Sequence, residues 1–231
     1  MAAASDPLRC HKVSEMGLRA RKKQRTRQAI AEAAFRLFEQ RGFEQVTVAE
    51  VARAADVSEG TVFNYFPTKE DLFYPQMEEF EAMLVQAVRD RPAGEPVSTA
   101  FARALLERTG RLGTDERAEL IARTSRTIEA SPSLQSRERE VVEHAVRALA
   151  ALLAEETGAR PTDAEPLAVA WALMGVQRAL TVYVRSSILA GRRGPKLAAD
   201  VRAQARRAFA RLDQGLADYA VKAYVARRST P

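Results

Sequence analysis

Hydrophobic residues from position 26 onward recur every three or four residues, which is the period of an amphipathic α-helix. The first such series shares one helical face and consists of Ala29, Ile30, Ala33, Ala34, Leu37 and Phe38. Gly42 follows where a left-handed residue commonly closes a helix. No segment alternates apolar and polar residues over the length of a strand. The pattern predicts an all-α protein of about nine helices.

Two short helices are expected next, because each begins with a capping residue. Thr47 and Glu50 form a capping box, and Ser58 caps the helix that Pro67 stops. Between the two helices, Asp56 falls in a tight turn where a left-handed backbone is usually needed.

The same segment has the internal spacing of a helix-turn-helix. Ala52 is small where the two helices cross, and Val62 fills the space between them. An ordinary helical hairpin within a bundle is the alternative interpretation.

Positive charge is concentrated before the first helix. The chain of 231 residues has a net charge of +6, and residues 18–27 carry six Lys and Arg with no acidic residue. Such a cluster is either a solvated tail or a phosphate-binding arm, and the helix-turn-helix beside it favours the arm. We expect residues 1–20 to be disordered.

Other features exclude several classes of protein. Cys10 is the only cysteine, and His11 and His144 are the only histidines, so no metal site or placed catalytic base is evident. The sequence lacks GxGxxG, GxxxxGK[ST] and GxSxG, and no apolar run approaches 18 residues. We expect a cytoplasmic protein that is neither an enzyme nor a membrane protein and needs no cofactor.

The run TVAEVARAADVSEGTVFNYFPTKEDLF and the TRQAIAEAAFRLFEQRGFEQVTV stretch that leads into it resemble the DNA-binding domain of the tetracycline-repressor (TetR) family. The resemblance covers residues 21–75. Asp56 replaces the usual glycine, and Phe63 stands where tyrosine is common.

The resemblance implies that residues 58–65 form a recognition helix for the DNA major groove. The implied base contacts are Glu59, Gly60, Thr61, Phe63 and Asn64, of which Asn64 suits bidentate pairing with adenine. The implied phosphate contacts are Thr47, Ser58, Tyr65 and Lys69, together with Arg21, Lys22 and Arg25 of the arm. The alternative for each one is a solvent-exposed side chain that contacts nothing.

Residues 76–231 are expected to form a larger helical domain that binds a ligand and dimerises. Gly94, Gly113, Gly158 and Gly194 separate its predicted helices, and Thr162 with Glu165 reads as a capping box.

The last two helices each carry an apolar stripe, and in the TetR family this pair forms a four-helix bundle with a second copy. The predicted dimer interface is therefore Ala205, Phe209, Leu212 and Leu216, with packing inside one chain as the alternative. A homodimer also suits a palindromic DNA operator, because one short helix reads too few base pairs.

A weaker resemblance concerns the effector. The segments RTSR from Arg123, EASPSLQ and LAVAWALMGV resemble a mycofactocin-regulator-like subgroup whose C-terminal domain binds long-chain acyl-CoA esters. The implied apolar tunnel would use Phe80, Met83, Phe101, Leu105, Trp171 and Met174, and the implied cations are Arg123, Arg126 and Arg178. Plain core residues and surface ion pairs are the alternative.

Together these features predict a homodimeric transcriptional repressor. It would bind double-stranded operator DNA and be released by a small apolar effector such as an acyl-CoA. The alternative is a helical DNA-binding architectural or interaction protein without an effector.

Overall fold

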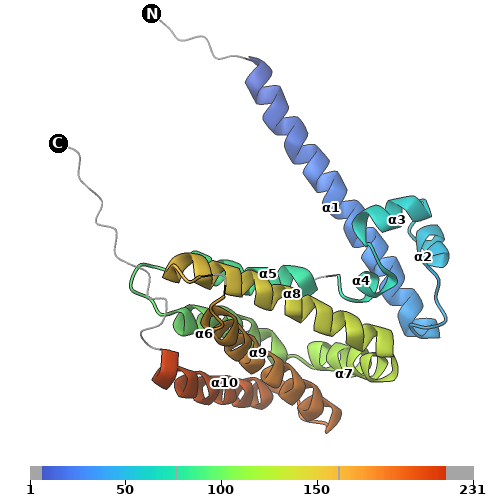
Figure 1. The fold of residues 1–231 in the computed structure, drawn as a ribbon. Coiled ribbons are helices and arrows are strands. Elements are labelled where there is room, and N and C mark those ends of the chain that lie inside the picture. The colour runs from blue at the N-terminus through green and yellow to red at the C-terminus, as the bar shows by residue number, and fades with distance from the viewer. Residues whose placement is uncertain (1–6, 76, 161, 217–231) are drawn as a thin grey trace, which may run out of the picture. The chain divides into compact units, whose positions relative to one another are not determined.

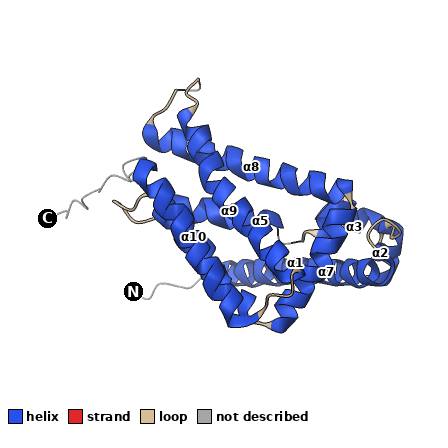
Figure 2. Cartoon of the chain, turned by 90° about the horizontal axis from the view of Figure 1, so that it is seen from below, coloured by secondary structure: helices blue, strands red, loops and turns tan. Residues whose placement is uncertain are grey.

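The computed structural model describes residues 7–75, 77–160 and 162–216, which are helical almost throughout (Figures 1 and 2). This part of the chain contains ten α-helices, one 3₁₀ helix and no strand. The all-α prediction is confirmed, but the expected helix four is two helices, α4 (Lys69–Phe73) and α5 (Met77–Arg89). Pro75 lies between them and lacks the N–H that a continuous helix needs.

The chain forms two compact units, Met1–Pro75 and Gln76–Pro231. In the first unit, α1 (Pro7–Arg41) packs against α2 (Val48–Ala54) and α4, and α2 packs against α3 (Glu59–Tyr65). The core of this unit comes from all four helices and the loops between them: Ile30, Ala33, Ala34, Phe38, Phe43, Val46, Val51, Ala52, Val62, Phe66 and Leu72.

Helix α1 begins earlier than the sequence pattern led us to expect. Residues 7–20, expected to be disordered, belong to α1, whereas residues 1–6 lie outside the described part. Pro7 suits the first position of a helix, and the following Leu, Arg, Lys and Gln residues favour helix without any apolar stripe.

Within residues 77–160 and 162–216, the second unit contains seven helical elements. They are α5, α6 (Val97–Glu107), the 3₁₀ helix η1 (Arg108–Gly113), α7 (Asp115–Ala130), α8 (Pro132–Thr157), α9 (Glu165–Leu189) and α10 (Gly194–Leu216). Helix α9 packs against α8, α10 and α7, and α5 packs against α6 and α8. Side chains from α5, α6, α8, α9 and α10 form one main apolar core.

Most helix ends follow their local sequence, but α9 does not. Ser131 caps α8, and Gly158 closes it in the left-handed conformation with φ of 66°. The predicted capping box of Thr162 and Glu165 is wrong, because α9 is preceded by Ala164 with no side-chain cap. Asp163 instead accepts a hydrogen bond of 2.8 Å from the Arg160 backbone N–H and closes the preceding turn.

A buried arginine joins α5 to α8. The Arg91 side chain has no exposed surface and pairs with both carboxylate oxygens of Glu156, at 3.0 and 2.5 Å. It also donates to the backbone carbonyls of Val88 and Glu95, at 2.7 and 3.1 Å. Every side of the guanidinium thus has a partner, which is what makes burial of this charge tolerable.

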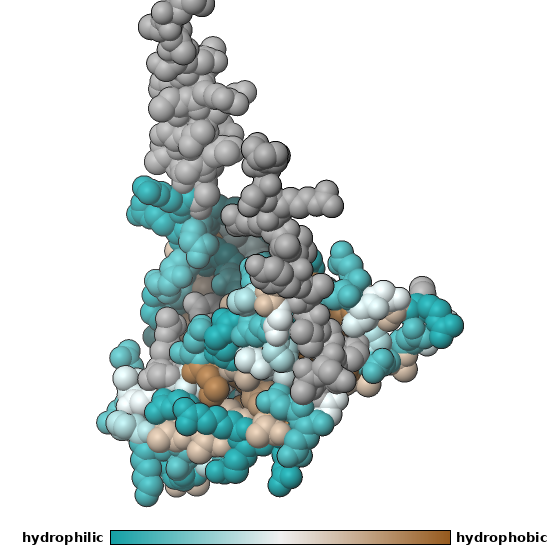
Figure 3. Space-filling model, turned by 90° about the vertical axis from the view of Figure 1, so that its left-hand side faces the viewer, coloured by the Kyte–Doolittle hydropathy of each residue, from teal (hydrophilic) through white to brown (hydrophobic). Residues whose placement is uncertain are grey.

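One face of the molecule is mainly hydrophilic, with smaller hydrophobic areas between the charged side chains (Figure 3). By length and composition alone, α9 could cross a membrane, and a third of its most apolar window is buried in the protein. Arg178 and Arg185 of this helix pair with Glu138 of α8, an arrangement that fits packing inside a folded protein.

Candidate DNA interface and effector site

The first unit has the local geometry of a helix-turn-helix. Asp56, in the turn between α2 and α3, has φ of 54°, the left-handed conformation that the sequence predicted. Aspartate tolerates this conformation better than most residues. Ala52 and Val62 are buried where α2 meets α3, as expected from their spacing.

A capping box fixes the start of α2. Thr47 accepts a hydrogen bond from the Glu50 backbone N–H, and Glu50 accepts one of 2.8 Å from the Thr47 backbone N–H. Arg41 adds an ion pair of 2.7 Å to the same carboxylate. The Thr47 backbone N–H, the Arg41 guanidinium and the Thr47 hydroxyl together lower the pKa of Glu50 to about 2. Glu50 is therefore ionised and connects the start of α2 to Arg41. The predicted capping box of Thr47 and Glu50 is confirmed.

The outer face of α3 presents the side chains that the resemblance assigned to DNA bases. Those that are exposed are Glu59, Gly60, Phe63 and Asn64. Phe63 is 47% exposed, unusually high for a large apolar side chain. Thr61 is half-buried, and its hydroxyl lies 2.8 Å from that of the capping residue Ser58. This face has the size and polarity to enter a major groove.

The candidate phosphate contacts differ in how they are held. Arg21, Lys22 and Arg25 are exposed along α1. Lys69 is half-buried instead: its Nζ lies 4.3 Å from the centroid of the Phe43 ring and donates to the Glu44 carbonyl at 3.3 Å.

Tyr65 is half-buried, and Ser58 and Thr47 are exposed but engaged in caps.

Sequence reasoning missed a second capping box, between Thr68 and Asp71 at the start of α4. Its signal was present as a threonine three residues before an acidic residue.

The residues predicted to line an apolar tunnel in the second unit do not share one environment. Phe101 and Met174 are fully buried in the main core, against which the half-buried Phe80, Met83 and Leu105 pack. Trp171 is 47% exposed. The expectation that Trp171 lines the interior beside Met174 is therefore not met.

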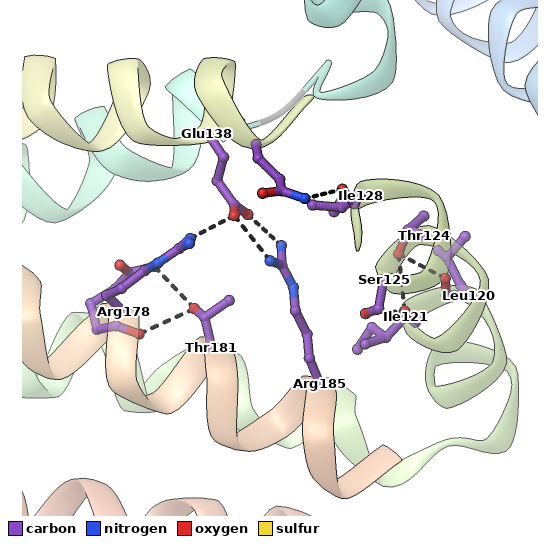
Figure 4. A network of polar contacts seen from close by, with 11 residues as sticks. Leu120, Ile121, Thr124, Ser125, Ile128, Glu138, Arg178, Thr181 and Arg185 are labelled. Carbon is purple, nitrogen blue, oxygen red and sulfur yellow. Dashed lines mark hydrogen bonds and ion pairs between the residues drawn. The ribbon is translucent and has the colours of Figure 1, made fainter. Parts of the chain in front are cut away.

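The three candidate arginines also differ. Arg123 and Arg126 are exposed on α7, whereas Arg178 forms an ion pair of 2.6 Å with Glu138. Figure 4 shows Arg178 and Arg185 reaching from α9 to that carboxylate on α8.

Glu138 and Glu81 form an acidic pair inside the second unit that sequence reasoning missed. Burial acts to raise the pKa of Glu138, but hydrogen bonds and charge from Arg185 and Arg178 outweigh it and lower that pKa. Burial, then the charge of Glu138, raises the pKa of Glu81 to about 7, against the opposing charge of Arg178. The available signal was the register of Glu81, which shares the buried face of α5 with Leu84 and Val88.

Part of the predicted dimer stripe is buried inside the chain. Ala205 and Phe209 are buried in the main core, the Phe209 ring lies 6.1 Å from that of Phe101, and Leu212 packs against the same core. The side chain of Leu216 lies outside the described part. For Ala205 and Phe209 the prediction was wrong, because an apolar stripe shows that a face is buried without showing which partner buries it. For Leu216 it stays a prediction.

A different apolar face is exposed, on α9. Among the described residues, four large hydrophobic side chains are exposed, and three of them belong to this helix: Leu167 at 44%, Trp171 at 47% and Val182 at 53%. Gly175 and Ala179 are exposed between them at helical spacing. We call these five residues the α9 face.

The surface also has a polar hollow of about 500 Å³ between α5 and α8. It is lined by Glu78, Arg137, Glu140, Val141, Glu143, His144 and Arg147. None of the predicted effector residues belongs to it. Within the described part of the chain, no group of three or more His, Cys, Asp or Glu side chains is placed to hold a metal ion.

A helix-turn-helix head followed by a larger helical unit defines a class of DNA-binding transcription regulators. The family model for bacterial regulatory proteins of the tetR family matches residues 30–74, and that for the MftR C-terminal domain matches residues 95–217. The chain belongs to the tetR family of transcriptional regulators.

Individual relatives agree with this assignment. The chain is 28% identical over 165 residues to the putative mycofactocin biosynthesis transcriptional regulator MftR of Mycobacterium tuberculosis, which covers 71% of this chain and 80% of that one. It is 34% identical over 100 residues to the HTH-type transcriptional regulator TcmR of Streptomyces glaucescens, covering 43% of this chain and 44% of that one. The fold is similar to that of a SmeT–triclosan complex, with a TM-score of 0.52, 17% identity, and coverage of 89% and 99%.

Proposed function

We propose that this protein is a cytoplasmic homodimeric repressor that binds a palindromic DNA operator and is released from it by a small apolar effector. The observation that carries the proposal is the exposed face of α3, held by a helix-turn-helix and joined to a second unit large enough to hold a sensor. Repression follows from occupying a promoter site.

The residues that read the operator are proposed to be those exposed on α3. Asn64 pairs with adenine through its amide, and Phe63 contacts the methyl group of thymine. Gly60 lets the backbone approach the base edges. Arg21, Lys22 and Arg25 bind phosphates, and because their stretch of α1 is helical, they act from a preformed surface.

A second copy of the chain is proposed to cover the α9 face. A solvated monomer rarely exposes three large hydrophobic side chains along one helix, and small residues between them allow two helices to approach closely. An isologous contact of this face with itself gives a dimer with twofold symmetry, which matches a palindromic operator.

The effector is proposed to act by population shift, because a ligand moves an equilibrium only by its difference in affinity between two states. Its apolar part would rest against Phe80, Met83 and Leu105, which are only half-buried against the core. An acyl-CoA remains the finer candidate from the MftR-like C-terminal domain, with Arg123 and Arg126 as candidate cations. Arg178 is less suited to its phosphates because its guanidinium already pairs with Glu138.

The test is to select bound fragments from the parent genome and then measure release of the protein from the selected site. A palindromic site occupied by one dimer and vacated with an apolar ligand is the expected result. Binding without sequence preference, unchanged by acyl-CoA esters or other apolar ligands, would instead establish the architectural alternative.

A further inference from the structure

The exposed face of α3 carries a single charge, and that charge is negative. Glu59 is the first residue of this helix and is exposed, and α3 contains no Lys or Arg to balance it. Helix α1 of the same unit is the opposite case, because Arg21, Lys22 and Arg25 are exposed along it. The helix proposed to enter the major groove therefore brings a carboxylate close to a polyanion.

The contacts at the start of α3 leave the Glu59 side chain to solvent. Among the described residues, no hydrogen bond or ion pair holds its carboxylate. The neighbouring cap does not involve it, because the Ser58 hydroxyl accepts from the Thr61 backbone N–H at 3.1 Å and lies 2.8 Å from the Thr61 hydroxyl. An acidic residue in the first turn stabilises a helix through its dipole. That effect is the same whatever DNA the protein meets, so it gives no sequence preference.

A carboxylate is selective in the major groove because it only accepts hydrogen bonds. Guanine and thymine present acceptors at their distinguishing positions, O6 and O4, which repel it, whereas the N4 amine of cytosine donates. Adenine also donates through N6, but its neighbouring N7 is an acceptor, so an amide suits adenine better than a carboxylate does. A carboxylate on this face therefore penalises every sequence that does not place a cytosine opposite it.

Phe63 indicates where that cytosine lies. It follows Glu59 by four residues, so the two exposed side chains are neighbours on one face of α3. Four residues of helix rise about 6 Å, which is less than two steps of about 3.4 Å between base pairs. The thymine proposed to contact Phe63 should therefore lie within two base pairs of the cytosine.

We propose that Glu59 is a specificity-determining residue, which accepts a hydrogen bond from N4 of a cytosine in each half-site and lowers the affinity for all other DNA. The proposal rests on the proposed function, because it specifies what the recognition helix reads. It gives opposite roles to two residues of one helix. Asn64 adds affinity where its base is present, and Glu59 removes affinity where its base is absent.

The experiment is selection of DNA from a random pool by the full chain and by two variants, followed by gel-shift titrations. The wild type should select a C·G pair at one position of each half-site, and any other pair there should weaken binding at least about tenfold. Glu59→Gln should move that preference to A·T, because a glutamine amide pairs with adenine through N6 and N7. Glu59→Ala should show no preference there and should bind random DNA more tightly than the wild type, since the phosphates no longer meet a carboxylate.

The matched control is Glu32→Gln, which removes one negative charge from an exposed position of α1 in the same unit. Its carboxylate contacts Gln28 of its own helix, and the variant should select the wild-type site. Circular dichroism melting shows that each variant is folded. Because the Glu59 side chain is exposed, its replacement should change the melting temperature little.

An identical selected site for the wild type and both Glu59 variants would overturn the proposal. So would an equal loss of affinity on all DNA, which is the result expected if Glu59 only stabilises α3. A change of site in Glu32→Gln would also overturn it, because net charge rather than the position of Glu59 would then set the preference. A wild type that selects no site refutes the repressor function and this inference with it, whereas a wild-type site that the Glu59 variants leave unchanged refutes this inference alone.

Discussion

At the scale of single residues, the exposed face of α3 is proposed to determine which DNA sequence the protein prefers. Asn64 is exposed and offers an amide that pairs with adenine, so Asn64→Ala should weaken operator binding by about 1–3 kcal/mol. Binding to random DNA should change little, because phosphate contacts supply it. Gel-shift titrations on both DNAs measure the difference, with Gln86→Ala in the second unit as the control. Equal losses on the two DNAs would remove Asn64 from base recognition.

Glu81 should make stability depend on pH in a direction unusual for a carboxylate. Burial and the nearby Glu138 raise its pKa from 4.5 to about 7, so the folded protein binds the proton more tightly than the unfolded chain. The stability that this proton contributes is present at pH 4.5 and is lost as the pH rises towards 7. Relative to Glu81→Gln, the wild type should lose about 2–3 kcal/mol of unfolding free energy between pH 5 and pH 8.

Urea unfolding at several pH values measures that difference. Glu138 does not interfere in this range, because its arginine partners lower its pKa below the usual value. If the two stability curves ran parallel from pH 5 to pH 8, Glu81 would be ionised throughout and the raised pKa would be refuted.

At the scale of elements, Arg91 should be the main polar link between α5 and α8. Arg91→Met should lower the free energy of unfolding by about 2–3 kcal/mol, because it leaves Glu156 and two carbonyls without their partner. The loss falls below that of a fully buried pair because the Glu156 side chain is 21% exposed.

The matched control for Arg91 is Arg147→Met. Arg147 pairs with Glu143 on the surface of α8, with side chains 72% and 50% exposed, and such pairs contribute under about 1 kcal/mol. Chemical denaturation of both variants tests the contrast. Equal losses would mean that the Arg91 contacts contribute no more than a surface pair.

The elements also show what a sequence can predict. Thr47, Asp56 and Ser58 act through neighbours within four residues, so their caps and turn were predictable. The start of α9 was not, because Asp163 competed locally with the expected cap of Thr162. Glu81 shares a helical face with Leu84 and Val88, but the charges that act on it, Glu138 and Arg178, lie far away in the sequence.

At the scale of the whole molecule, the apolar faces of the last two helices differ in what covers them. The α10 stripe with Phe209 completes the core of its own chain, and the apolar face that remains exposed belongs to α9. Periodicity identified both helices as amphipathic or apolar, but their partners are a property of the tertiary fold. The place of each face in the fold therefore decides whether a charged substitution there should unfold the chain or break the proposed contact with a second copy.

Trp171→Glu should break the proposed dimer and leave the subunit folded. A charge at the centre of an apolar interface removes a hot-spot contact worth 2 kcal/mol or more, so the dimer dissociation constant should rise at least about thirtyfold. Trp171 is 47% exposed, so its own chain should lose little stability. Phe209→Glu is the contrasting variant, because it places a charge in the core and should unfold the chain.

Light scattering over a range of concentrations, together with circular dichroism, separates these outcomes. We expect a folded monomer with Trp171→Glu, which should also lose operator affinity because a single head reads only half of a palindrome. Ala148→Glu, at an exposed position on α8, is the control and should remain a dimer. A Trp171→Glu protein that stays dimeric at the same concentrations would show that the second copy packs elsewhere, and that the α9 face serves another purpose.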